Sequence, residues 1–277
     1  MELTSDNGDV APEVRLGRRI RQLRKENGLS LRQLSERVGG FSYSYIGRVE
    51  LGRQPASDGL VTALDEFFGT GGTLSEIKGL ARDIVIAQYS REYVRRERGA
   101  SRIQSFASSL IPGLLQTKDY ARELFRASSV RASDREIDAQ VATRMERQAV
   151  FLRDEPPYYL AVIDEAAFRR PTLDRRIIRE QLEHIASFGS NPYATIQVLP
   201  FAQGLHPMLG GTLNLLTLKD GRMVALVESF RSGDVVESSS SLLELVQRFD
   251  LARSKALPAT ESLDLIRNYL KEYSDES

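Results

Sequence analysis

Residues 29–53 read LSLRQLSERVGGFSYSYIGRVELGR, and this stretch decides the fold of the N-terminal part of the chain. Leu34 and Val38 recur at helical spacing before a glycine pair, and Ile46 and Val49 recur in the same way after it. An apolar stripe on each side of a turn is the pattern of two short amphipathic helices. The stretch therefore predicts two helices that share a core and leave their other faces exposed.

The signals for helix ends agree with this prediction. Ser30 and Ser42 are residues whose side-chain oxygens cap the first turn of a helix. Gly39 stands where the first helix must end in a left-handed conformation, which glycine adopts without steric cost. The two helices are expected at about 31–38 and 43–50.

The outward side chains of the second helix are suited to reading DNA, because an α-helix fits the major groove and meets the base edges there. Arg48 can pair bidentately with guanine, Ser44 can donate or accept a hydrogen bond, and Tyr43 can touch a base or a phosphate. Phosphate contacts position a protein without specifying sequence. The further side chains expected at the DNA, mostly near its backbone, are Arg32, Gln33, Ser42, Tyr45 and Arg53.

The charge of the chain is unevenly placed. The 277 residues carry no net charge, so the whole molecule is not a general binder of polyanions. Residues 13–54, however, hold ten Arg or Lys against four acids, a net charge of +6, which leaves −6 for the remainder. A basic module on an acidic chain fits local contact with nucleic acid. The alternative is a small helical domain whose arginines only face solvent.

Composition excludes several classes of function. There are no cysteines, which excludes disulfides, thiol catalysis and Cys-ligated zinc. No apolar run approaches the length of a membrane span, and the first twelve residues lack the features of a signal peptide. We expect a cytoplasmic protein without cofactor or membrane partner, and with a flexible tail at residues 1–12.

Further helical patterns flank the central pair. One precedes it at 13–27 and ends at Gly28, and two follow it, at 58–68 and from about 74 to 98. The N-terminal part is thus expected to be an all-α helix-turn-helix domain, spanning residues 13–98 and binding double-stranded DNA.

The remainder of the chain has a different character. Four stretches predict strands, at 158–164, 194–200, 212–218 and 223–229. Asp220 and Gly221 signal a hairpin between the last two. Helical patterns are expected at 118–127, 134–152, 173–188, 240–256 and 260–272. The sequence therefore predicts an α+β domain over residues 99–277, with a regulatory or interaction role.

A family resemblance joins these observations. The segments GRRIRQLRKENGLSLRQLSERVG (17–39) and SYSYIGRVELGRQPAS (42–57) resemble the XRE family of helix-turn-helix regulators, which is related to phage repressors. The resemblance implies an ion pair between Arg24 and Glu50 that ties the first helix to the third. We expect a homodimer that reads half-sites about one helical turn apart.

Two departures from the family pattern affect the expected DNA contacts. The turn GGF (39–41) has one residue more than is usual, which leaves the register of the base contacts open. Leu31 stands where relatives often have a glutamine that bonds a phosphate, and its presence weakens one expected anchor.

The second half also carries a resemblance. The segments LIPGLLQTKDYAR (110–122), RMERQAVFLRDEPP (144–157), VIDEAAFRRP (162–171) and IQVLPFAQGLHPMLGG (196–211) resemble an actinobacterial regulator family that joins an XRE domain to a C-terminal domain of unknown function. Its members are often described as antitoxin-like, and some are encoded beside a very small protein. The resemblance implies that a small protein partner is one candidate for the C-terminal domain.

The sequence offers little support for catalysis. It contains no Gly-rich phosphate loop, nucleophile elbow or metal-spaced histidine cluster. Asp164 and Glu165 could serve acid–base chemistry and His206 could line a pocket, but helix capping and loop packing are ordinary roles for them. We expect no enzyme. Two hypotheses remain: a dimeric, sequence-specific transcriptional regulator, and an antitoxin-like protein that restrains a small partner and regulates its own synthesis.

Overall fold

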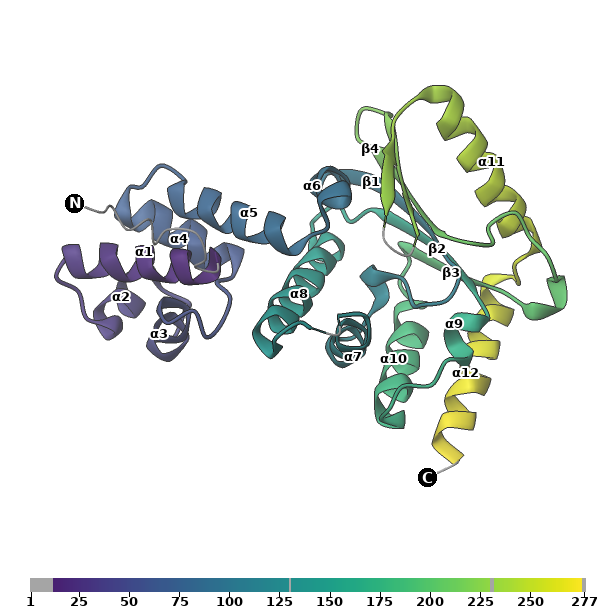
Figure 1. The fold of residues 1–277 in the computed structure, drawn as a ribbon, viewed down its shortest axis with the longest axis horizontal. Coiled ribbons are helices and arrows are strands. Elements are labelled where there is room, and N and C mark those ends of the chain that lie inside the picture. The colour runs from purple at the N-terminus through teal and green to yellow at the C-terminus, as the bar shows by residue number, and fades with distance from the viewer. Residues whose placement is uncertain (1–11, 130, 230–231, 276–277) are drawn as a thin grey trace. The chain divides into compact units, whose positions relative to one another are not determined.

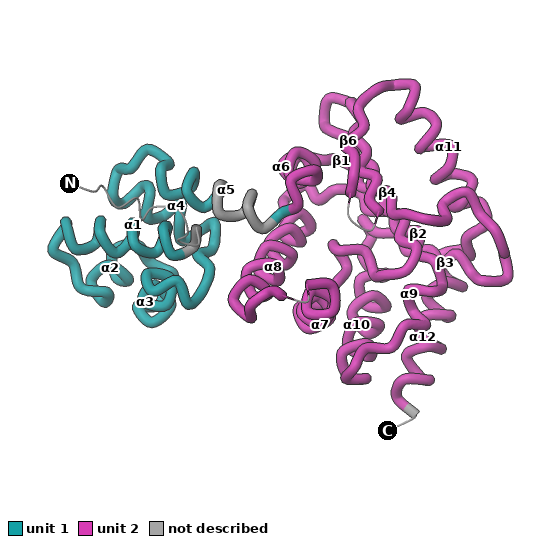
Figure 2. Tube along the Cα trace, in the orientation of Figure 1, with its two compact units in different colours: residues 1–86 teal, residues 87–277 magenta. Residues whose placement is uncertain are grey.

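The computed structural model describes residues 12–129, 131–229 and 232–275. The chain forms two compact units, Met1–Ile86 and Ala87–Ser277, which Figure 2 shows in teal and magenta. Residues 1–11 of the predicted tail lie outside the described residues. None of the described helices is both long and apolar enough to cross a membrane.

The first unit is all-α, as the sequence predicts (Figure 1). Its helices are α1 (Pro12–Glu26), α2 (Leu31–Val38), α3 (Tyr43–Glu50), α4 (Asp58–Phe68) and α5 (Thr73–Val85). The predicted bounds of the second, third and fourth helices are correct. The apolar faces meet in one core, which includes Leu16, Ile20, Leu23, Leu34, Ile46, Val49, Leu60 and Leu64.

Glycines fix several helix ends in this unit. Gly52 has a φ of 63°, and its N–H donates to Val49 O at 2.9 Å while the Arg53 N–H reaches back to Arg48 O at 2.8 Å. This is the pattern of a Schellman cap, which satisfies carbonyls at a helix end. Gly28, which follows α1, has the same bonding pattern. Such local determinants explain why the helix ends could be predicted from the sequence.

The helix predicted from about 74 to 98 is wrong, because the structure breaks it. α5 ends at Val85, a short 3₁₀ turn spans Gln88–Ser90, and α6 begins at Arg91 and ends at Glu97. Tyr93 and Glu97 are buried in the second unit, which begins at Ala87. The break therefore coincides with the boundary between the two units.

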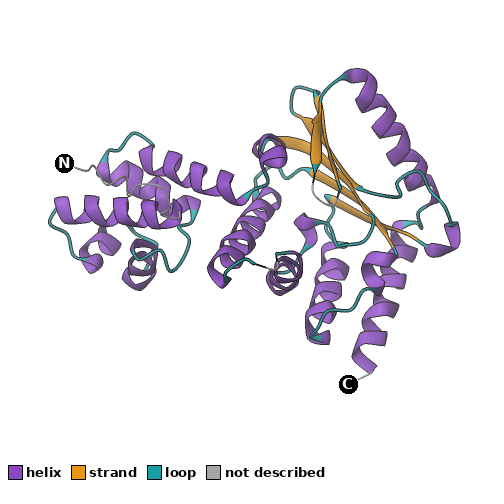
Figure 3. Ribbon diagram, in the orientation of Figure 1, coloured by secondary structure: helices purple, strands orange, loops and turns teal. Residues whose placement is uncertain are grey.

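The second unit contains a six-stranded mixed sheet in the order β3–β2–β1–β4–β5–β6 (Figure 3). Its strands are β1 (Ala100–Ala107), β2 (Tyr158–Asp164), β3 (Ala194–Leu199), β4 (Thr212–Leu218), β5 (Met223–Glu228) and β6 (Gly233–Val236). β1 pairs with β2 in parallel, as β2 does with β3, whereas β4, β5 and β6 continue the sheet in antiparallel fashion. The α+β class and the four predicted strands are therefore correct.

Two strands were missed, and one of them lies at the centre of the sheet. β1 reads ASRIQSFA, in which polar residues interrupt the apolar ones. Its Ser105 is buried, and the Ser105 hydroxyl is satisfied there by donating to Asn214 Oδ1 on β4 at 2.8 Å. β6 is only four residues long. β1 depends on β2 and β4, which are distant in sequence, and single-strand patterns do not show such pairings. β6 pairs with the preceding strand β5 and is too short to give a clear strand pattern.

Helices cover both faces of this sheet (Figure 1). α11 (Ser239–Lys255) packs on one face, where Phe249 belongs to the same buried core as Phe106 and Leu160. The opposite face carries Tyr159, whose ring contacts Phe151 and Phe188. The remaining α-helices of this unit are α7 (Lys118–Ser128), α8 (Asp134–Arg147), α9 (Ala166–Arg169), α10 (Arg175–Phe188) and α12 (Ala259–Asp275).

Candidate DNA-binding surface

The turn between α2 and α3 accommodates its extra residue. Gly39 and Gly40 adopt φ values of 61° and 69°, a region that side-chain-bearing residues rarely occupy. The Ser35 hydroxyl donates to Phe41 O at 2.6 Å and closes the turn. The Phe41 ring is half-buried against the core of the first unit. The long turn is thus an ordered connection in which Phe41 contributes to packing.

An ion pair links α1 to α3, as the family resemblance implies. Arg24 Nε and Nη2 bond the two carboxylate oxygens of Glu50 at 2.6 and 2.7 Å, and its Nη1 donates to Leu29 O at 2.8 Å. Glu50 is almost fully buried, and it holds the pKa of Arg24 above the usual range against the opposing effect of burial. Bidentate pairs of this kind fix geometry as well as charge.

A glycine allows α1 to approach the C-terminal end of α3. A Cβ at Gly17 would clash with Val49 O and lie 2.9 Å from Glu50 O.

Leu31 is half-buried, and a Cβ at Gly47 would lie 3.2 Å from its Cδ1. Leu31 therefore packs against α3, which gives a structural reason for an apolar residue at that position.

The outer face of α3 presents three of the predicted contact residues. Tyr43 is 48 % exposed, and Ser44 and Arg48 are exposed. The Arg48 guanidinium is already held: Nη1 donates to Ser44 Oγ at 2.7 Å, and Nε donates to Gln54 Oε1 at 2.8 Å. Gln54 was not predicted as a site residue. Its position beside Arg48 results from the turn at Gly52, and no pattern in the sequence marks it.

Side chains at the start of α2 adjoin this face. The Arg32 guanidinium lies over the Tyr43 ring, 5.3 Å from its centroid, which is a cation–π contact. Gln33 completes a capping box with Ser30, since its Oε1 accepts from the Ser30 N–H at 2.9 Å. Arg32 thus lies beside Tyr43, while the Gln33 carbonyl is occupied within the helix cap.

Three other predicted residues surround α3. Ser42 caps the helix by accepting from the Tyr45 N–H at 3.2 Å. The Tyr45 hydroxyl faces inward, donating to Pro55 O at 3.2 Å and accepting from the Ser57 N–H at 2.7 Å. Tyr45 therefore joins α3 to the start of α4, which is a structural role. Arg53 is exposed just past the helix.

The residues considered for catalysis are engaged with other parts of the second unit. His206 Nε2 lies 3.1 Å from Asp164 Oδ2, and its Nδ1 accepts from the Met208 N–H at 3.3 Å. Asp164 Oδ1 accepts from the Ala166 N–H at 2.9 Å. Glu165 accepts from the Phe201 N–H at 2.7 Å. These bonds attach the loop after β3 to the end of β2.

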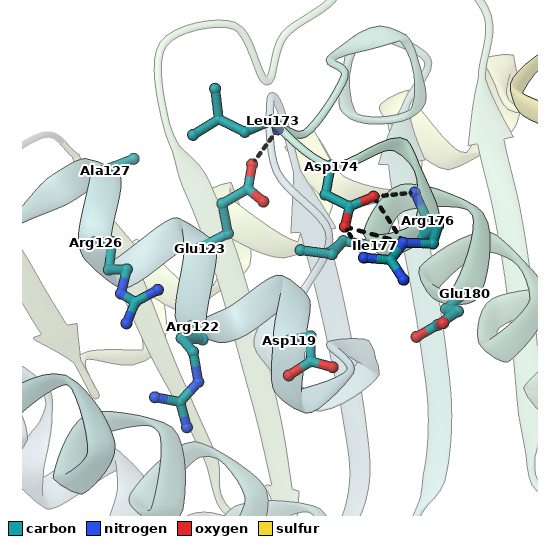
Figure 4. Close-up of a pocket in the computed structure, with 10 residues that line it drawn as sticks. All are labelled: Asp119, Arg122, Glu123, Arg126, Ala127, Leu173, Asp174, Arg176, Ile177 and Glu180. Carbon is teal, nitrogen blue, oxygen red and sulfur yellow. Dashed lines mark hydrogen bonds and ion pairs between the residues drawn. The ribbon is translucent and has the colours of Figure 1, made fainter. Parts of the chain in front are cut away.

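A groove of about 740 Å³ lies between α7 and α10 (Figure 4). Leu173 stands beside it and is 98 % exposed, while its backbone N–H donates to Glu123 Oε1 at 2.5 Å. The charged side chains around it include the pair Asp174–Arg176 at 2.6 Å. The groove therefore combines a fully exposed apolar side chain with a rim of both charges.

The first unit has the fold and exposed third helix of a helix-turn-helix DNA-binding domain. Residues 15–76 match the family described as a helix-turn-helix domain. Residues 90–268 match the family described as a domain of unknown function, DUF5753, and the chain belongs to that family. No curated protein and no solved structure matches the chain.

Proposed function

We propose that the protein is a sequence-specific transcriptional regulator of the XRE type, which binds DNA as a homodimer. The second unit would bind a small protein partner or a ligand. The observation that supports DNA reading best is the exposed, hydrogen-bonded guanidinium of Arg48 on α3. A fork held in one orientation loses little conformational freedom when it pairs with guanine.

The surroundings of Arg48 supply the other parts of a DNA interface. Tyr43 and Ser44 share its exposed face, and Arg32 lies beside Tyr43. Arg32 and Arg53 provide charges for phosphate contact, which positions a protein on the duplex. Because phosphate binding releases counterions, the affinity for DNA is expected to fall steeply with rising salt.

The test begins with the DNA sequences that the full chain selects from a random pool. Arg48→Ala should lower the preference for selected over random DNA by roughly five- to 150-fold, which corresponds to about 1–3 kcal/mol for a bidentate base contact. Arg48→Lys is the matched variant, because it keeps the charge without the planar fork. It should keep the salt dependence of the wild type and still lose most of the preference.

Two results would contradict the proposal. Unchanged preference in Arg48→Ala would show that Arg48 does not read a base. Failure of the wild type to select any sequence would contradict specific DNA reading altogether. Dimerisation is tested separately, by sedimentation of the full chain and by the spacing of protected half-sites, expected at roughly 34 Å.

A second candidate is an antitoxin-like protein that restrains a co-encoded small protein and regulates its own synthesis. The groove between α7 and α10 favours it, because an exposed leucine within a charged rim resembles the centre of a protein interface. Leu173→Asp should then abolish co-purification of the small protein and leave DNA binding unchanged. No co-purification with the wild-type chain would contradict this candidate.

A further inference from the structure

The groove between α7 and α10 has one side on each helix (Figure 4). Its apolar side chains are those of Ala127, Leu173 and Ile177, and the exposed Leu173 lies at the same end as Ala127. The other side chains that line it are charged: Asp119, Arg122, Glu123, Arg126, Asp174, Arg176 and Glu180. Which of these charges already have partners determines what the groove can bind.

Each arginine that lines the groove already pairs with a carboxylate. The three pairs are Arg122–Asp138 at 2.5 Å, Arg126–Asp134 at 3.1 Å and Arg176–Asp174 at 2.6 Å. The acids of the first two pairs belong to α8, so these two arginines are engaged outside the groove. An acidic partner would therefore have to displace an existing carboxylate from every guanidinium that it used.

Two carboxylates of the groove, in contrast, are unpaired. Asp119 on α7 and Glu180 on α10 are exposed, and neither forms a hydrogen bond or an ion pair with another described residue. Figure 4 shows them on the two sides of the groove, at the end away from Leu173. Arg176 lies one turn before Glu180 but pairs with Asp174. These two carboxylates are thus free to meet cations of a partner.

The surroundings of the groove are acidic as a whole. Four acids and three arginines line it, and the two acids of α8 that pair with Arg122 and Arg126 bring the local net charge to −3. Complementary charges guide partners together, and like charges suppress wrong ones. The groove therefore favours a cationic partner and disfavours nucleic acid, which binds the other unit in the proposed function.

We propose that this groove binds a cationic amphipathic helix of a partner protein. A large apolar side chain of that helix packs against Leu173 and Ile177, and Lys or Arg side chains pair with Asp119 and Glu180. A helix lying in a groove with its apolar face inward is a recurring mode of recognition. Asp119 and Ala127 are eight residues apart on α7, about 12 Å along its axis. The apolar and cationic side chains of the partner are therefore about two helical turns apart.

This inference rests on the second candidate function and gives the chemistry of its partner. The experiment selects peptides with the full chain from a phage-displayed library, in which the exposed positions of an alanine-rich helix are randomised. The enriched peptides should carry Lys or Arg about two turns from a large apolar residue. Their affinity, measured by fluorescence titration of the synthetic peptide, should fall with rising salt because exposed charge pairs are screened.

A double variant assigns the binding to the two unpaired carboxylates. Asp119→Asn combined with Glu180→Gln removes both charges and keeps the shape of the side chains. It should lower the affinity for the selected peptide roughly two- to thirtyfold and remove most of the salt dependence. The matched control is Asp250→Asn combined with Glu261→Gln on α11 and α12. Both acids are exposed and unpaired among the described residues, so the control removes the same charge elsewhere and should keep the full affinity.

A second pair of variants tests the apolar end. Leu173→Gln should lower the affinity roughly tenfold or more, because a leucine side chain that becomes buried on binding is lost. Leu152→Gln changes a leucine that is 86 % exposed and does not line the groove, and it should bind as the wild type does. All of the substituted side chains are exposed, and thermal unfolding should show unchanged stability for each variant.

Several outcomes overturn the proposal. They are no enrichment, enrichment of acidic or uncharged peptides, full affinity in the groove double variant or in Leu173→Gln, and an equal loss in a control. The small co-encoded protein separates this inference from the candidate function. If it co-purifies with the wild type and equally with the groove double variant, the candidate function stands and the groove assignment fails. If cationic peptides bind through the groove but no small protein co-purifies, the groove assignment stands and the candidate function fails.

Discussion

The two units use polar side chains over very different distances along the chain. In the first unit the capping and DNA-facing bonds are local, as between Ser30 and Gln33 or between Arg48 and Ser44 four residues earlier. In the second unit Arg147 bonds Glu97 fifty residues away, and Gln181 Nε2 bonds Leu115 O over 66 residues. Local chemistry can be recognised in a sequence, whereas a long-range bond such as Arg147–Glu97 leaves no local pattern. The Arg24–Glu50 pair of the first unit, which spans 26 residues, was expected only through the family resemblance.

The largest expected effect breaks a long-range bond of the second unit. Arg147→Ala leaves Glu97 buried and unpaired, and we expect the second unit to lose about 3–5 kcal/mol of its free energy of unfolding. Chemical denaturation measures this loss. Arg248→Ala, which breaks the exposed pair with Glu244, should change stability by at most about 0.5 kcal/mol. If both variants lost the same free energy of unfolding, burial of the ion pair would not explain the effect of Arg147→Ala.

A smaller loss is expected where α1 meets α3. Gly17→Ala places a Cβ against the carbonyls of Val49 and Glu50, and overpacking of this kind costs about 1–3 kcal/mol. The loss should appear in the unfolding of the first unit and leave the second unchanged. Gly79→Ala is the control, since a Cβ there meets no atom within 4 Å. A stable Gly17→Ala protein would show that the helices can separate without cost.

The loss of stability of the first unit at acidic pH should result in part from protonation of Asp65. Burial alone would raise the pKa of Asp65, but hydrogen bonds from Thr70, Ser75 and the backbone N–H of Leu74 hold it below the usual value. The ionised form therefore stabilises the folded state above the unfolded pKa of about 4, and this stabilisation is lost as pH falls through the lower folded pKa.

Thermal unfolding between neutral and acidic pH measures this contribution. Asp65→Asn should be less stable than the wild type at neutral pH and should change less as the pH falls. If the wild type and Asp65→Asn lost the same stability on acidification, another carboxylate would be responsible for the loss. The variant Asp220→Asn alters an exposed carboxylate of the second unit and should leave the first unit unaffected.

The smallest expected effect is a loss of DNA preference when Arg48 loses one of the hydrogen bonds that orient its guanidinium. Gln54→Ala removes the bond to Arg48 Nε, and a hydrogen bond of this kind contributes about 0.5–1.5 kcal/mol, or roughly a two- to tenfold loss of preference for selected DNA. Competition binding against random DNA measures it, and the salt dependence should stay unchanged. Gln22→Ala, which affects only an exposed bond to Glu26, should keep the full preference.

The sequence by itself determined the first four helices of the first unit. The bounds of α2, α3 and α4 follow from serine caps and glycine ends, which act within a few residues of each other. The exposed positions of Tyr43, Ser44 and Arg48 follow from helical periodicity. The α+β class of the second unit follows from its four apolar strand patterns.

Only the tertiary structure decided which polar groups face inward. In the structure the Tyr45 hydroxyl bonds Pro55, Gln54 bonds Arg48, and the predicted long helix is interrupted before α6. The strand β1 lies at the centre of the sheet, although its sequence is polar in part. Each of these outcomes depends on a partner that is distant in sequence or lies beyond a turn. Burial and hydrogen bonding to such partners outweigh local preference.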